Sequence, residues 1–137
     1  MKIILSGFIK DNNPLFNARI NNNKCLEFNN NGSIFVTVDT GFIGGIALPK
    51  EILSKLSIKF VAYESFILAN GSKIRLKVFT GRVVVKKKNV ETLFIEGDYL
   101  IGMELMSSLA DELRVDFKNK KVRLIEEMDK EFKTRKK

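Results

Sequence analysis

The chain has 137 residues, of which 45% are hydrophobic and 29% charged, so one globular domain can form without disulfides or metals. It contains no histidine and one cysteine, Cys25, which excludes Ser-His-Asp and Cys-His catalysis, the usual zinc sites and an internal disulfide. Any catalysis must come from carboxylates, lysine, tyrosine or the lone thiol. The net charge of +8 keeps nucleic acid among the candidate partners.

The apolar run at the start of the chain is too short for a secretory signal, and no stretch approaches the ~20 apolar residues that span a bilayer. We therefore expect a soluble, cytoplasmic protein with no membrane partner. Basic residues cluster at Lys86-Lys87-Lys88 and from Lys130 to Lys137, and both runs are typical of solvated segments. We accordingly expect a domain over residues 1–129 and a basic tail over 130–137.

Strand signals dominate the first third of the chain. Strands are predicted at 2–8, 16–20, 24–28 and 34–38, with Asn-rich turns at 21–23 and 29–32. The run Ile34 to Val38 is almost wholly apolar, which predicts a strand covered on both faces. This strand leads directly into Asp39.

The remainder of the chain alternates short strands with two short helices. A helix is predicted at 49–56, and strands are predicted at 60–68, 73–79, 82–85 and 90–95, with a hairpin turn at 69–72. A second helix is expected at 103–113 from the spacing of Met106, Leu109, Ala110 and Leu113. A last hairpin alternates Val115/Phe117 with Val122/Leu124 around 118–121. The pattern predicts a single all-β domain, a closed barrel with one or two short helices.

Asp39-Thr40-Gly41 carries the chemistry that the sequence suggests. An aspartate placed after an apolar strand and before a small hydroxyl residue and a glycine can be held by backbone N–H groups. Carboxylate-based peptide hydrolysis needs one carboxylate to take a proton from water and another to protonate the scissile carbonyl. A chain with one such triplet must obtain the second carboxylate from a partner, and a two-fold homodimer supplies it by symmetry.

From Ile34 to Leu124 the order of signals resembles the retropepsin-like aspartic peptidases, particularly their small cellular relatives in microbes. The strand into Asp39-Thr40-Gly41 resembles the catalytic strand of that family. Leu100-Ile101-Gly102, placed before a helix, resembles its second hydrophobic-hydrophobic-glycine marker. The hairpin between Leu68 and Lys73, with its tip at Asn70-Gly71, lies where the family carries its flap.

The resemblance implies an acid-protease barrel and an aspartic endopeptidase that acts as a homodimer on peptide or protein substrates. No metal or organic cofactor is implied. Asp39, Thr40 and Gly41 would be catalytic. The residues implied for substrate binding are Phe42, Ala69, Asn70, Gly71, Leu100, Ile101 and Gly102. Within this set, Leu100 to Gly102 would form a hydrophobic layer beneath the carboxylates.

The sequence also departs from the family pattern. Ile43 and Met103 stand where viral members carry an ion pair, so we expect one buried apolar contact in its place. Phe42 replaces a small residue and is expected to narrow the cleft. The flap has one glycine where viral flaps have several. Two alternatives stay open: a peptidase-like binding module with little or no cleavage, and a small basic β-barrel that binds nucleic acid.

Overall fold

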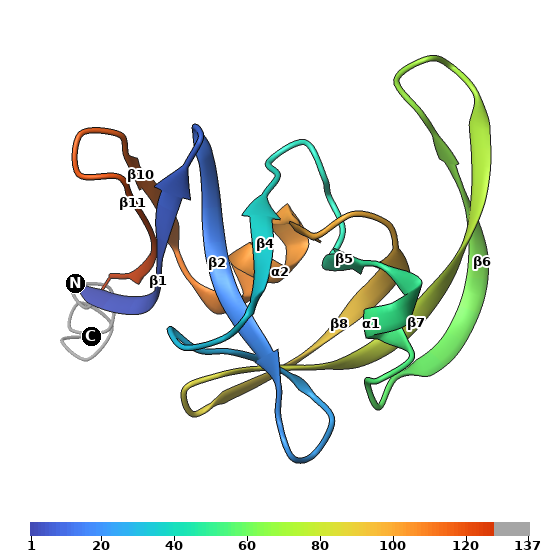
Figure 1. Cartoon of the computed structure of the whole chain (residues 1–137), viewed down its shortest axis with the longest axis horizontal. Helices are drawn as coiled ribbons and strands as arrows, with labels where there is room; N and C mark the ends of the chain where they lie inside the picture. The colour runs from blue at the N-terminus through green and yellow to red at the C-terminus, as the bar shows by residue number, and fades with distance from the viewer. Residues whose placement is uncertain (128–137) are drawn as a thin grey trace, which may run out of the picture.

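The computed structural model describes residues 1–127, which form eleven strands and two short helices (Figure 1). The strands are β1 (Lys2–Lys10), β2 (Asn13–Ile20), β3 (Leu26–Phe28), β4 (Ile34–Val38), β5 (Ile46–Leu48), β6 (Lys59–Ile67), β7 (Lys73–Val85), β8 (Lys88–Glu96), β9 (Leu100–Ile101), β10 (Glu112–Asp116) and β11 (Lys121–Glu126). The helices are α1 (Lys50–Leu53) and α2 (Met103–Leu109). The expected tail at 130–137 and the domain boundary at 129 lie outside the described residues.

Seven of the described strands close into a barrel. In the order β2, β3, β7, β8, β5, β9 and β4 each strand pairs with the next, and β4 pairs back with β2. Large apolar side chains fill the interior, among them Phe16, Leu26, Ile46, Phe94 and Ile101. The predicted all-β closed barrel with two short helices is therefore confirmed.

Further strands extend the sheet beyond the barrel from two barrel strands, β2 and β7. On one side β1, β11 and β10 follow β2 in order, and β10 forms the edge. On the other side β6 pairs with β7 in a long hairpin that rises away from the barrel (Figure 1). Its turn is closed by Leu68 N–H, which donates to the Ser72 carbonyl at 2.8 Å, and Gly71 adopts a left-handed φ of 85°. The turn predicted at 69–72 is confirmed, since glycine takes this conformation at no steric cost.

Several predicted strand boundaries were wrong. The strands expected at 73–79 and 82–85 are one strand, β7, because Gly81 faces Ile58 and Phe94 in the barrel wall and does not form a turn. The strand expected from Lys24 begins at Leu26, since Lys24 has a left-handed φ of 60°. The strand at 34–38 is covered on alternate residues only, and Phe35 remains 46% exposed.

The predicted helices are longer than the observed ones. α2 ends at Leu109 and Ala110 is already extended, because Asp111 N–H donates to the Ile125 carbonyl and draws the chain into the sheet. Leu113 therefore belongs to β10 and not to the helix. The helix expected at 49–56 spans Lys50–Leu53, followed by tighter turns that reach Leu56. Phe117, predicted to belong to the alternating pattern of the last hairpin, lies after the end of β10 and is 70% exposed.

Candidate active site

Asp39 lies at the carboxyl end of β4, beside β9. The two strands are parallel, with Thr37 next to Leu100 and Val38 next to Ile101. Asp39 N–H continues this ladder by donating to the Ile101 carbonyl at 3.1 Å. The backbone of Asp39 is therefore fixed by the barrel wall itself, which joins the two motifs that the sequence singled out.

The turn after Asp39 holds its carboxylate from the backbone. Gly41 N–H donates to Asp39 Oδ1 at 3.0 Å, and Phe42 N–H donates to the Asp39 carbonyl at 3.1 Å. Asp39 is partly buried, whereas Thr40 and Gly41 are exposed. The arrangement presents an oriented carboxylate at the protein surface, with the exposed residue Thr40 beside it.

The segment from Asp39 to Gly45, called here the Asp39 loop, is fastened to the start of α2. Gly102, Met103 and Glu104 donate their backbone N–H groups to the carbonyls of Gly45, Phe42 and Ile43, at 2.8, 2.8 and 2.9 Å. The first N–H groups of a helix have no partner within the helix and normally require a cap. Here no side chain caps α2, and the loop carbonyls accept these hydrogen bonds instead.

Gly102 permits this close approach. A Cβ placed there would lie 2.2 Å from the Gly44 carbonyl oxygen and 2.8 Å from Phe42 Cδ2. The Phe42 ring also lies close to Gly44 and is half-buried. Phe42 therefore packs the Asp39 loop onto the beginning of α2. Its direct contact with a substrate stays a prediction.

Ile43 and Met103 do not form the buried contact that the sequence predicted. In the single chain Ile43 is 79% exposed and Met103 is 42% exposed. The loop and helix are joined through backbone atoms, so these two side chains project outward from the joint. The Asp39 loop and the start of α2 therefore each carry an apolar side chain that the described chain leaves exposed to water.

A line of mostly apolar side chains crosses the sheet next to Asp39. It is made of residues that pair directly across neighbouring strands, and such partners share one face of a sheet. In order, this apolar row contains Thr37, Leu100, Ala47, Ile95, Val78 and Ala62. Ala47 and Val78 are buried yet lie outside the main core cluster, which places the row on the outer wall of the barrel.

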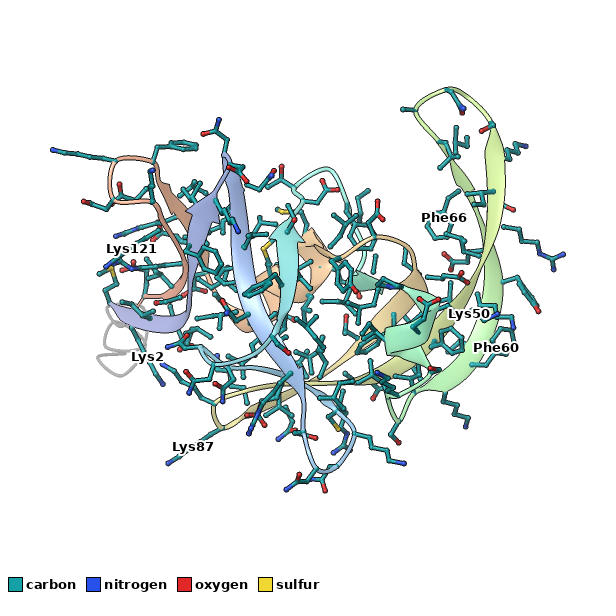
Figure 2. The ribbon with its side chains drawn as sticks, in the orientation of Figure 1. Lys2, Lys50, Phe60, Phe66, Lys87 and Lys121 are labelled. Atoms are coloured by element: carbon teal, nitrogen blue, oxygen red, sulfur yellow. The ribbon has the colours of Figure 1, made fainter. Side chains whose placement is uncertain are left out.

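The β6–β7 hairpin extends the apolar row beyond the barrel. Phe66 lies on the concave side of the hairpin, facing the rest of the molecule (Figure 2). The tip residues Ala69, Asn70 and Gly71 are exposed and stand apart from the Asp39 loop, although both lie on the same side of the barrel (Figure 1). The single chain thus brings Asp39 to Phe42 together with Leu100 to Gly102, and leaves the tip separate.

The apolar row was the part of the site that sequence reasoning missed, except for Leu100. Ala47, Val78 and Ile95 come from strands far apart in the chain, and their common face depends on strand register. The one available signal was strand alternation. It shows which residues of one strand share a face, but it does not show which residues of a neighbouring strand lie on that same face.

The chemistry open to the described residues is that of carboxylates. Within residues 1–127, no group of three or more His, Cys, Asp or Glu side chains is arranged to hold a metal ion. The same part of the chain has no helix that is long and apolar enough to cross a membrane. A hollow of about 420 Å³ lies between β1, residues 27–31 and Val85-Lys86, away from Asp39. Thr40, Gly41 and Ile43 are exposed, so this part of the Asp39 loop lies at the surface of the single chain.

Comparisons of this chain with protein family models, with curated proteins and with solved structures gave no match.

Proposed function

We propose that this chain is one half of a homodimeric aspartic endopeptidase of the retropepsin-like type. The observation that carries the proposal is the position of Asp39. Its carboxylate is held by Gly41 N–H, its backbone is fixed by Ile101, and its loop is fastened to Gly102. An oriented carboxylate beside an apolar row that continues onto a projecting hairpin suits the binding of an extended peptide.

A second protomer completes the site. Two-fold symmetry brings the same residue of each chain to the axis, so two Asp39 side chains meet there. The exposed apolar side chains of Ile43, on the loop, and Met103, at the start of α2, become buried on each chain in such a contact. Covering them removes apolar surface from water, which favours association.

The paired carboxylates perform acid-base catalysis. Two carboxylates within hydrogen-bonding reach share one proton, because both cannot ionise so close together. The ionised Asp39 takes a proton from water while the oxygen of that water attacks the scissile carbonyl carbon. The protonated Asp39 gives its proton to the carbonyl oxygen. In the collapse of the tetrahedral intermediate, the carboxylate that gave up its proton takes one from a hydroxyl of the intermediate, and the other carboxylic acid protonates the nitrogen. The C–N bond breaks, the amine leaves, and the pair again shares one proton.

The expected substrates are peptides with apolar side chains near the scissile bond. The partly exposed members of the apolar row, Leu100, Ile95 and Ala62, offer apolar contacts beside Asp39, whereas Ala47 and Val78 between them are buried. Phe66, Ile74 and Leu76 continue the row on the hairpin, so a peptide lying beneath the hairpin meets mostly hydrocarbon. Burial of its apolar side chains there contributes about 25 cal/mol per Å² of area removed from water.

The test is cleavage of a diverse peptide library over a range of pH, with and without a statine-type transition-state analogue. We expect cleavage that the analogue inhibits and that Asp39→Asn abolishes, because the amide is nearly isosteric but cannot act as the base. Glu51→Gln, which removes one carboxylate charge at an exposed position on α1, is the control and should cleave normally. Full turnover by Asp39→Asn chains would overturn the mechanism. Analogue binding without any cleavage would indicate a peptidase-like binding module.

A second candidate function, nucleic-acid binding, is favoured by one observation. Lys73, Arg75 and Lys77 occupy alternate positions on β7 and therefore share one exposed face of the hairpin. The run Lys86 to Lys88 suits this role less well. Lys86 Nζ donates to the Ile3 carbonyl at 2.9 Å, and Lys88 Nζ donates to the Leu109 carbonyl at 3.2 Å. Affinity for random-sequence DNA that falls steeply with salt, and falls further in Lys73→Gln/Lys77→Gln chains, would support this function over the peptidase.

A further inference from the structure

One carboxylate interrupts the apolar concave side of the β6–β7 hairpin. Residues that pair across the hairpin share a face, and the pairs on the concave side are Ala62 with Val78, Glu64 with Leu76, and Phe66 with Ile74. Figure 2 fixes the orientation of this face, since Phe66 points toward the barrel. Of these six side chains, Glu64 alone carries a charge.

Glu64 has no ion pair within residues 1–127. The three cations of the outer part of β7, Lys73, Arg75 and Lys77, pair with Ile67, Ser65 and Tyr63 on the opposite, convex face. Arg75 lies over the Tyr63 ring, 4.6 Å from its centroid. Charge on the hairpin is thus segregated, with cations on the convex face and a lone carboxylate on the concave face.

The free-energy cost of covering Glu64 depends on the side chain that the substrate places next to it. In the single chain Glu64 is exposed and hydrated. A peptide held between the hairpin and the apolar row removes water from this carboxylate, and an unpaired, desolvated carboxylate is costly. A neutral or acidic peptide side chain leaves that cost in place. A lysine or arginine side chain replaces the lost water with a charge-assisted hydrogen bond.

We propose that Glu64 is a specificity-determining residue that selects substrates with a lysine or arginine side chain beneath the hairpin. The inference rests on the proposed function, and it adds a basic residue to an otherwise apolar substrate class. Discrimination works in both directions, because the carboxylate attracts a cation and penalises its absence. The homodimer contains two copies of Glu64, so the basic preference appears at two positions related by symmetry about the scissile bond.

The experiment compares kcat/KM for matched peptides that carry Lys, Gln or Glu at each position around an apolar core. In the wild type we expect Lys to be preferred over Gln on the order of tenfold at two symmetric positions. Glu64→Gln should abolish the preference, and Glu64→Lys should reverse it toward Glu. Ratios within one variant are compared, so a loss of folded protein cancels. Glu51→Gln on α1 makes the same change in net charge at an exposed site and should keep the wild-type ratio.

A binding measurement with the same peptides tests the role of Glu64 separately from the proposed function. Asp39→Asn chains, which cannot cleave in the proposed mechanism, are titrated with the same fluorescent peptides at low and high salt. Tighter binding of the Lys peptide that weakens with salt and disappears in Asp39→Asn/Glu64→Gln chains supports the role of Glu64, with or without turnover in the wild type. Equal affinity for the Lys and Gln peptides, or an unchanged ratio in Glu64→Gln, would overturn it. If the wild type cleaves none of the peptides, the proposed peptidase function is overturned, and the role of Glu64 in binding is not.

Discussion

Gly102 is the residue on which the geometry of the candidate site depends most directly. A side chain at this position would meet the backbone of Gly44 and the ring of Phe42 at distances that real Cβ atoms do not adopt. The Asp39 loop would have to move away from α2, and the three hydrogen bonds to its carbonyls would lengthen. The hydrophobic-hydrophobic-glycine pattern thus has a local physical reason that is independent of any family.

We expect Gly102→Ala to lower the free energy of unfolding by about 1–3 kcal/mol, as overpacking does in other cores. Peptide cleavage should fall more than stability does, because the displaced loop carries Asp39. Gly97→Ala is the matched control, since its Cβ would lie at an ordinary 3.5 Å from Ala47 Cβ. Urea unfolding and kcat/KM on one peptide measure both effects. A Gly102→Ala chain with wild-type activity would show that the loop tolerates the shift.

Gly71 tests a different property of glycine. Its φ is 85°, and a Cβ there would meet nothing within 4 Å, so any cost of substitution is conformational and not steric crowding. Gly71→Ala should destabilise the hairpin turn by about 1–2 kcal/mol, and Gly71→Asn by less, because asparagine tolerates the left-handed region. Hydrogen exchange at the amides of Leu68 and Gly71, which close the turn, reports the effect. Equal exchange in the two variants would contradict this account.

At the scale of elements, the Arg19–Glu27 pair links β2 to β3 in the barrel wall. The two residues lie opposite each other, with Arg19 Nη2 3.0 Å from Glu27 Oε2. Burial opposes ionisation of Glu27, yet hydrogen bonds from Asn21, Arg19 and Asn29 together hold the pKa of Glu27 below its ordinary value of 4.5. The folded chain therefore binds this proton less tightly than the unfolded chain.

The sign of the pH dependence follows from that lowered pKa. Glu27 contributes stability above pH 4.5, and the contribution is lost as the pH falls through the folded-state pKa. We expect the gap in unfolding free energy between the wild type and Glu27→Gln to narrow in acid. The gap in unfolding free energy between the wild type and Arg19→Gln should also narrow in acid, but by less, because Asn21 and Asn29 still hydrogen-bond to Glu27 in that variant. Denaturant titrations between neutral pH and pH 3 measure the gap, and a constant gap would contradict the assignment.

The elements that the sequence predicted well are those with local causes. The turn at Asn70-Gly71 is encoded by residues that accept left-handed backbone, and the strand before Asp39 by a run of β-branched and aromatic residues. The helix predicted to reach residue 113 ends earlier because Asp111 N–H donates to the Ile125 carbonyl of β11, a tertiary contact. The apolar row could not be predicted for the same reason, because its common face depends on strand register, which is set by partners distant in sequence.

At the scale of the whole molecule, the proposed function requires a second chain to complete the candidate site. Ile43, Met103 and Tyr99 are exposed near the Asp39 loop or β9, and the hairpin tip stands apart from that loop (Figure 1). Ile43 and Met103 come from segments that are joined by backbone hydrogen bonds, and exposed apolar side chains that gather on a small protein mark an interaction site. A second copy that contributes its own Asp39 would cover these side chains and bring two carboxylates together. The shared site can be tested without a structure of the complex.

The test mixes wild-type chains with Asp39→Asn chains, which are denatured and refolded together so that exchange is complete. Heterodimers hold one carboxylate and should be inactive, because one group cannot serve as both base and acid. With a wild-type fraction f, active dimers scale as f squared, so activity per wild-type chain should fall in proportion to f. Mixing with Glu51→Gln chains, which lose a carboxylate at an exposed position on α1, provides the control and should leave total activity undiminished.

Dilution examines the same claim by mass action. A site that exists only in the dimer must lose specific activity below the dimer dissociation constant. Ile43→Asp, which places a charge on the exposed loop beside the axis, should shift this loss to higher protein concentration, because the charge loses water in the contact. The barrel should keep its stability, since Ile43 is 79% exposed in the single chain. If activity per wild-type chain stays constant both on mixing and on dilution, the site is not shared. The second carboxylate must then come from the same chain, and Asp98 or Glu104 becomes the residue to replace.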